Sequence, residues 1–140
     1  MRVLLSIKPE HVENIFNGDK IYEFRRRVFV RRDVRSAVVY STSPVGKIVG
    51  EFDISEILCA SPDELWKKTA SGSGITRQYY DAYFAGRARA FALAIGAVRR
   101  YEVAVAPRDL LASFRPPQSY MYVDDGVGVD WLYKNQGELF

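Results

Sequence analysis

The chain has few of the residues on which disulfide, zinc and histidine chemistry depend. Cys59 is its single cysteine and His11 its single histidine. One cysteine forms no disulfide within the chain, which favours a reducing compartment and predicts a cytoplasmic protein. One histidine and one cysteine do not make a zinc site of usual composition, and histidine-dependent triads are not expected. We therefore expect neither a metal nor a cofactor.

Long apolar segments and phosphate-binding glycine motifs are missing too. Val3-Leu4-Leu5 is too short for the apolar region of a signal peptide, and no apolar run approaches the about 20 residues that span a bilayer. The sequence holds neither a P-loop nor a G-x-G-x-x-G motif. We expect no membrane partner. An enzymatic reaction would have to rely on Lys, Glu, Asp, Tyr or Ser.

What the chain does contain is sufficient for one folded domain. Its 140 residues are 48% apolar and 14% aromatic, which predicts a single domain over residues 1–140. The net charge is only +3 but is unevenly placed. Six arginines fall between residues 25 and 35, opposed there only by Asp33: Arg25, Arg26, Arg27, Arg31, Arg32 and Arg35. Such a stripe attracts phosphate, although a solvated β-hairpin has the same pattern.

Apolar periodicity predicts a mixed order of strands and helices. Strands are expected at 3–7, 20–25, 37–41, 46–54, 89–95, 98–105 and 120–123, with a bulge or bend at Gly50. Helices are expected after Pro9 and Ser61-Pro62, from Thr76 to about Ala85, and as a turn at 107–111. Cys59, between Leu58 and Ala60, is expected in the core. This order indicates an α+β domain whose curved sheet of about six strands closes into a barrel.

The most informative stretch runs from Gly18 to Arg25. Gly18 ends a helix, and the strand that follows alternates apolar Tyr22 and Phe24 with charged Glu23 and Arg25. With Lys20 at its start, the strand could line a polar cleft that grips an anionic or base-like ligand. The alternative is an edge strand whose charged face is solvated.

Gly18, Lys20, Glu23 and Arg25 match the G-x-K-x-x-E-x-R motif of the ASCH domain family, a branch of the PUA-like superfamily. Ser6-Ile7-Lys8-Pro9 resembles the opening strand–helix junction of that family. The segments Tyr80–Gly86 and Pro116–Ser119 resemble a subgroup described as predicted transcriptional regulators. The resemblance covers nearly the whole chain. It implies a small PUA-like β-barrel with helices packed at its ends and a cleft suited to RNA or a nucleotide.

The resemblance leaves two activities open. Many PUA-like domains bind RNA, which favours an RNA- or nucleic-acid-binding, regulatory protein. Some ASCH proteins are ribonucleases, and a related group hydrolyses acetylated cytidine with a lysine, a threonine three residues later and a distant glutamate. Lys20 matches that lysine, but Glu23 occupies the threonine position. A third reading is a protein-interaction domain.

These readings predict the site residues. For an enzyme, Lys20 and Glu23 are the expected catalytic pair. For binding, cationic side chains are expected to contact the phosphates of the nucleic acid. Glu23 is expected to accept a hydrogen bond from an exocyclic amine of a base, and a tyrosine ring to stack on a base. The expected nucleic-acid contacts are Lys8, Lys20, Glu23, Arg25, Arg26, Arg27, Arg31, Arg32 and Tyr80. The partner is RNA or a nucleotide, and the oligomeric state is left open.

Overall fold

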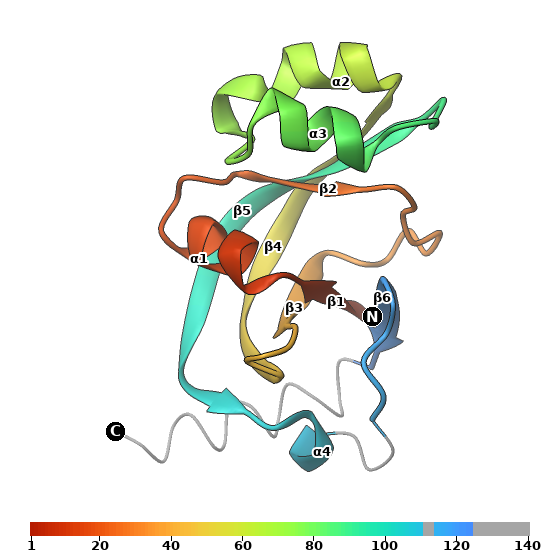
Figure 1. The fold of residues 1–140 in the computed structure, drawn as a ribbon. Coiled ribbons are helices and arrows are strands. Elements are labelled where there is room, and N and C mark those ends of the chain that lie inside the picture. The colour runs from red at the N-terminus through yellow and green to blue at the C-terminus, as the bar shows by residue number, and fades with distance from the viewer. Residues whose placement is uncertain (111–113, 125–140) are drawn as a thin grey trace.

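The computed structural model describes residues 1–110 and 114–124. Six strands form one sheet: β1 (Arg2–Ile7), β2 (Tyr22–Arg25), β3 (Ser36–Ser41), β4 (Lys47–Ala60), β5 (Ala90–Val105) and β6 (Tyr120–Val123). The helices are α1 (Pro9–Phe16), α2 (Pro62–Thr69), α3 (Arg77–Tyr83), α4 (Pro107–Leu110) and the 3-10 turn η1 (Ala70–Gly72). Figure 1 shows α2 and α3 together at one end of the sheet, where β4 and β5 reach farthest.

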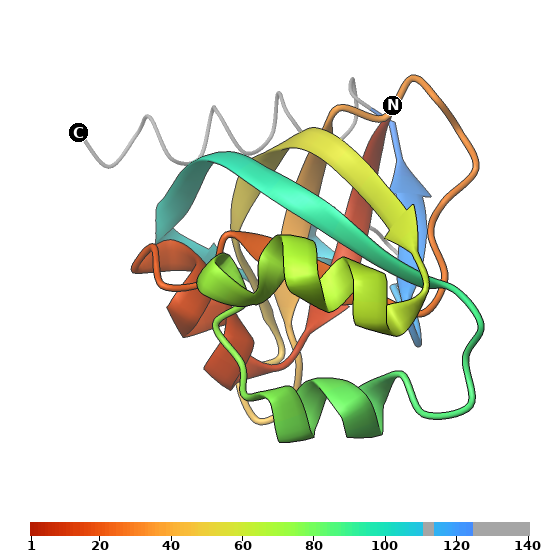
Figure 2. The ribbon, with the colours of Figure 1, turned by 90° about the horizontal axis from the view of Figure 1, so that it is seen from above.

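The sheet contains both parallel and antiparallel strand pairs, and β2 and β6 are its two edge strands. The strand order is β2-β5-β4-β3-β1-β6, with β1 and β3 parallel and the other pairs antiparallel. The predicted α+β class and the strand number are confirmed. Barrel closure is not shown, because the described ladders do not pair β2 with β6. The sheet instead curls, and Figure 2 shows its long strands β4 (yellow) and β5 (teal) bending across the molecule.

Apolar side chains fill both faces of the curled sheet. Val3 and Leu5 of β1 belong to the cluster that α1 covers, whereas Leu4 belongs to a second cluster on the opposite face. A third cluster joins α2 and α3 to β2 through Phe24, Leu65, Tyr80 and Phe84. Because β1 is buried on both faces, its apolar residues Val3, Leu4 and Leu5 follow one another without polar alternation.

The predicted starts of α2 and α3 are confirmed, and so are the residues that cap them. The Ser61 hydroxyl accepts from the Glu64 backbone N–H at 3.4 Å, and Pro62 is the first residue of α2. The Thr76 hydroxyl accepts from the Tyr79 N–H at 3.1 Å and begins α3. Each cap satisfies a donor that would otherwise lack an intrahelical partner. These short-range bonds fix where α3 begins, and therefore which of its tyrosines face the site.

Two predictions about the long strands are wrong. Residues 89–105 do not form two strands, because β5 continues through Gly96. The β4–β5 register shifts opposite this point, and a Cβ at Gly96 would lie 3.4 Å from Asp53, so the glycine marks an irregularity within one strand. Cys59 is exposed rather than buried, because β4 extends to Ala60 and turns this side chain outward.

The predicted irregularity at Gly50 is confirmed by a register shift against β3. Among residues 1–110 and 114–124, none of the helices has both the length and the apolar character to cross a bilayer.

Candidate functional site

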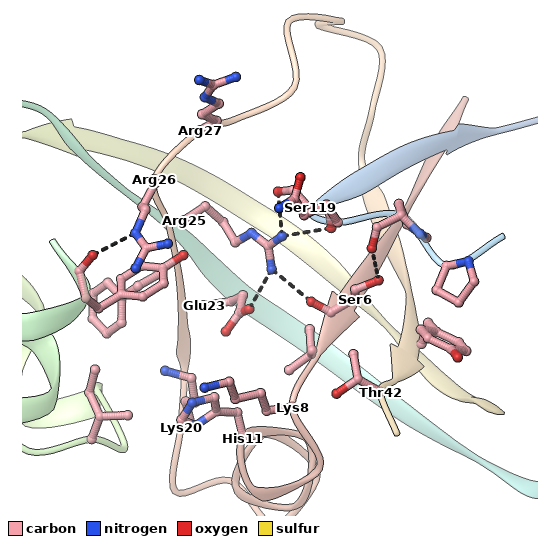
Figure 3. A pocket seen from close by; sticks show the side chains of 18 of the residues that line it. Ser6, Lys8, His11, Lys20, Glu23, Arg25, Arg26, Arg27, Thr42 and Ser119 are labelled. Atoms are coloured by element: carbon pink, nitrogen blue, oxygen red, sulfur yellow. Dashed lines mark hydrogen bonds and ion pairs between the residues drawn. The ribbon is translucent and has the colours of Figure 1, made fainter. Parts of the chain in front are cut away.

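A cleft of about 780 Å³ crosses β2, between α1 and α3 on one side and residues 116–119 on the other (Figure 3). Lys20, Glu23 and Arg25 all line it, as the motif predicts. The alternative of a solvated edge strand is wrong. Although β2 is an edge strand, Lys20, Glu23 and Arg25 are only 2%, 5% and 8% exposed. Charged groups buried this far are retained only with partners, which the cleft supplies.

Arg25 holds the two edges of the curled sheet together. Its Nη1 donates to Glu23 Oε2 at 3.1 Å and to the Ser6 carbonyl at 3.3 Å. Its Nη2 donates to the carbonyl and the hydroxyl of Ser119 at 2.8 and 2.7 Å. One guanidinium therefore connects the end of β2 with β1 and with the segment before β6. A planar group with several fixed donors suits such a junction, which a lysine would not reproduce.

Lys20 lies at the floor of the cleft. Its Nζ donates to the Ser73 carbonyl at 2.9 Å and lies 4.7 Å from the centre of the Phe24 ring. Burial lowers the pKa of the Lys20 amine below its usual value, and the negative charge of Glu23 opposes that shift. A protonated Lys20 is therefore a positive charge with little solvent around it, next to the cleft. Such a charge acts on a bound anion far more strongly than one in water.

The loop 72–74 fits closely around Lys20. Gly74 has a φ of +66°, and a Cβ added there would lie 2.6 Å from the Lys20 Cβ. The Ile21 N–H donates to the Gly72 carbonyl at 2.9 Å, which fastens the loop to the chain beside Lys20. Gly72-Ser73-Gly74 has the composition of a flexible linker. In the structure it is instead a closely packed support for Lys20 that requires glycine at position 74.

Gly74→Ala is expected to destabilise the protein by about 2–5 kcal/mol. About 1–2 kcal/mol comes from a side chain at positive φ, and about 1–3 kcal/mol from overlap with Lys20. Gly86→Ala is the matched control, since Gly86 has a φ of +77° and a Cβ added there would meet no atom within 4 Å. Urea denaturation measures both. Equal losses in the two variants would contradict the close packing of the loop on Lys20.

The cleft is strongly positive. Among the residues that the structure describes, Glu23 is the one carboxylate that lines it, and six cationic residues do: Lys8, Lys20, Arg25, Arg26, Arg27 and Arg87. Four of them are exposed at the rim: Lys8, Arg26, Arg27 and Arg87. Arg26 is held in place, because its Nε donates to the Tyr83 carbonyl at 2.7 Å and its guanidinium lies 4.2 Å from the centre of the Tyr83 ring. A rim of this charge favours an anionic ligand.

The other predicted contacts lie elsewhere. Arg31 and Arg32 are exposed on the loop between β2 and β3, away from the cleft lining, and Arg31 forms a two-point ion pair with Asp33. The prediction that Tyr80 stacks on a base is wrong. Tyr80 is 0% exposed, packs on Phe24 and Phe84, and donates its hydroxyl hydrogen to the Pro62 carbonyl. Its place in the core follows from the face that α3 turns toward β2.

Several lining residues escape sequence reasoning. His11 and Tyr79 meet in the cleft, with His11 Nε2 3.1 Å from the Tyr79 hydroxyl. Hydroxyl-bearing residues from further segments also line it: Ser6, Tyr40, Thr42, Ser43 and Ser119. Neighbouring Tyr79 and Tyr83 signal an aromatic helix face, but only the packing of α3 decides which tyrosines face the cleft. Within the described residues no group of three or more His, Cys, Asp or Glu side chains could hold a metal.

Comparisons with known proteins find relatives in sequence and in structure. No family model matches the chain. Over 109 residues it is 30% identical to large ribosomal subunit protein uL22 of Ureaplasma parvum, a match that covers 77% of this chain. The chain spans only 34% of the length of that relative. It is also 27% identical over 126 residues to an ASCH domain-containing ribonuclease of Zymomonas mobilis, covering 86% of this chain and 82% of that protein.

The fold agrees with that second relative. The crystal structure of ASCH from Zymomonas mobilis superposes with a TM-score of 0.86 at 24% identity, covering 94% of this chain and 93% of the other. The shared fold, the sequence match along most of both chains and the buried motif residues Lys20, Glu23 and Arg25 in one cleft agree with one another. Along most of its length the chain is therefore similar in sequence to an ASCH domain-containing ribonuclease and in fold to ASCH from Zymomonas mobilis.

Proposed function

We propose that this protein is a ribonuclease that binds a single-stranded segment of RNA in the cleft and cleaves it there. The observation that carries the proposal is the charge of the cleft, with six cationic residues and one carboxylate lining it. A chain of phosphates is the biological polyanion that such a surface attracts. The likeness to an ASCH domain-containing ribonuclease supports cleavage in addition to binding.

The size of the cleft favours a single strand. At about 780 Å³ it has the volume of a small-molecule site, enough for a short run of nucleotides. Unpaired bases can be splayed into such a site, whereas a duplex presents its phosphates outward. Tyr79 and Tyr83 offer ring surface on one wall, while Lys8 and Arg26 lie beside them to contact phosphate. The cleft thus offers aromatic surface for the base of a nucleotide and positive charge for its phosphate.

The floor of the cleft supplies charge for the reaction. During cleavage the phosphate gains negative charge on its non-bridging oxygens. Fixed positive groups that face this charge in a poorly hydrated site lower the barrier. We assign this role to Lys20, which Glu23 and the Ser73 carbonyl keep in place. Arg25 has four of its hydrogen bonds within the protein, so we assign it to holding the cleft in shape.

The proposal is tested with a labelled single-stranded RNA oligonucleotide. The wild-type protein should shorten it, and Arg26→Ala should slow cleavage by weakening binding. Lys67→Met is the matched control, because Lys67 is an exposed cation on α2 that pairs with Glu64 and lies outside the cleft lining. The assay is run with and without added Mg²⁺, so that both metal-dependent and metal-independent cleavage would be detected. Intact RNA in all of them would contradict the proposal.

A second candidate function is RNA binding without cleavage. One observation favours it: both groups that the sequence offers for catalysis have protein partners, Lys20 with Ser73 and Glu23 with Arg25. The same oligonucleotide distinguishes the two functions. Retention of RNA on the protein without any shortening would favour the binder, in keeping with a regulatory role.

RNA affinity is expected to fall steeply with salt under either function. If about four phosphates are neutralised, the logarithm of the association constant should fall against the logarithm of salt concentration with a slope of about −3. Fluorescence anisotropy with a non-cleaved RNA measures it. Arg26→Ala should make the slope shallower by about 0.7, while Lys67→Met should leave it unchanged. A flat salt dependence would argue against phosphate contacts in the cleft.

A further inference from the structure

His11 is the one histidine of the chain, and it lies in the cleft without any role in the motif. It belongs to the first turn of α1, and Figure 3 shows its ring beside Lys8 and Lys20. Its Nε2 lies 3.1 Å from the Tyr79 hydroxyl, and the two rings meet edge to face at 5.2 Å between centres. Two contacts from α3 therefore fix the orientation of the imidazole.

The hydrogen bonding around Tyr79 sets the direction of this contact. Lys8 Nζ lies 3.5 Å from the Tyr79 oxygen and can only donate to it. The oxygen therefore acts as acceptor toward Lys8, and its hydrogen is free to point at His11 Nε2. In this arrangement Nε2 is the acceptor of the pair. That is the state in which a histidine can take up a proton.

The other ring nitrogen also singles out His11. Nδ1 is buried and has no hydrogen-bond partner among the described residues. A buried polar atom without a partner costs stability and calls for an explanation, of which a catalytic role is one. A merely structural side chain at this half-buried position would not need an imidazole.

Burial favours the neutral form of His11, and the charges around it act in both directions. Glu10 and Lys8 lie on its own segment, Lys20 and Glu23 face it from β2 and the turn before it, and Tyr79 faces it from α3. Burial is the largest effect and lowers the pKa of His11, which Lys20 and Lys8 lower further and the two glutamates raise. At neutral pH the imidazole is therefore uncharged and able to act as a base.

We propose that the Tyr79–His11 pair takes the proton from a ribose 2′-hydroxyl, so that the cleft cleaves RNA, and not DNA, by attack of that hydroxyl on the adjacent phosphate. The proposal rests on the ribonuclease function proposed above. As the 2′-oxygen forms its bond to phosphorus, its proton passes to the Tyr79 oxygen and the Tyr79 proton passes to His11 Nε2. The bond from phosphorus to the 5′-oxygen breaks, and water protonates that oxygen. The products are a 2′,3′-cyclic phosphate and a 5′-hydroxyl, and solvent later removes the proton from His11.

The first experiment needs no variant. An RNA oligonucleotide is compared with the same molecule carrying a single 2′-deoxynucleotide at the preferred cleavage position. We expect cleavage of the first with a 2′,3′-cyclic phosphate end, and at least about a hundredfold slower cleavage of the second at that position, since it lacks the nucleophile. Equal cleavage of both, or a product ending in a 3′-hydroxyl, would overturn the proposal while leaving the ribonuclease function standing. Failure to cleave any RNA would overturn both.

The second experiment tests the pair itself. His11→Gln keeps a side chain that can accept from Tyr79 but takes up no proton, and Tyr79→Phe keeps the ring without the hydroxyl. Each should slow cleavage at least about a hundredfold, the low end of the usual contribution of a positioned base. Glu13→Gln is the control on the same helix, since Glu13 is exposed and pairs with Arg100.

The pH profile separates a proton-transfer role from a structural one. The wild-type rate should rise with pH through an acidic limb below about 6.5, the ordinary value for histidine, because burial lowers the pKa of His11. His11→Gln should lose this limb, and Glu13→Gln should keep it. Retention of the limb in His11→Gln, with RNA still cleaved, would overturn the proposal. Should His11→Gln not fold, Tyr79→Phe and the 2′-deoxy substrate decide the question.

Discussion

Replacing Arg25 with alanine is expected to lower the free energy of unfolding by about 3–5 kcal/mol, the usual cost of removing one partner of a buried ion pair. Glu23, which is only 5% exposed in the wild-type protein, would lose the cation that its carboxylate pairs with. The carbonyl groups of Ser6 and Ser119 would lose their hydrogen-bond donor. Because Arg25 joins both edges of the curled sheet, the damage should reach the β6 segment as well as β2. Urea denaturation followed by tryptophan fluorescence measures the loss.

The control and the double variant identify the cause. Arg32→Ala removes an arginine of the same stripe from an exposed loop position and should change the free energy of unfolding by less than about 0.5 kcal/mol. Adding Glu23→Gln to Arg25→Ala should restore part of the lost stability, because the unpaired charge is then gone. A loss in Arg25→Ala no larger than that of Arg32→Ala would contradict the role of Arg25 as the link between the edges.

The parts of the fold that short-range chemistry decides could be predicted from the sequence. Ser61-Pro62 and Thr76 begin helices because a hydroxyl beside a helix start meets a free backbone N–H wherever the chain folds. Gly18 ends α1 with a φ of +89°, so the strand that follows enters the cleft at Lys20. The turn at Gly18 therefore brings Lys20, Glu23 and Arg25 to one cleft.

The remaining features depend on contacts between distant segments. Gly96 looks like a break between two strands, but the pairing of β5 with β4 keeps the chain extended through it. The choice between Tyr79 and Tyr80 depends on how α3 rotates, and one residue along a helix changes direction by about 100°. His11 is a single residue without a pattern, and its meeting with Tyr79, 68 residues away, exists only in the folded chain.

Lys20→Met is expected to leave the protein folded while changing how its stability depends on pH. The pKa of Lys20 is lowered in the folded state, chiefly by burial, so between that lowered pKa and the unfolded value of 10.5 the unfolded chain binds more protons. Stability therefore carries a penalty below the folded pKa, and the penalty is relieved as pH rises through this window. Lys20→Met removes the group and with it this rise. Denaturation at several alkaline pH values measures the difference between the two proteins.

The same variant should show whether the charge at the floor of the cleft serves a reaction. If Lys20 stabilises the phosphate during cleavage, Lys20→Met should slow RNA cleavage about 10²–10³-fold, the usual cost of losing one preorganised electrostatic contact. RNA affinity should fall by only about 1 kcal/mol, as for one charged contact. Arg26→Ala, which removes an exposed cation from the rim of the cleft, should mainly raise the substrate concentration needed for half-maximal rate. Equal and modest losses in both variants would instead indicate that Lys20 contributes to binding alone, because a group that acts on the transition state must affect the rate more than the affinity.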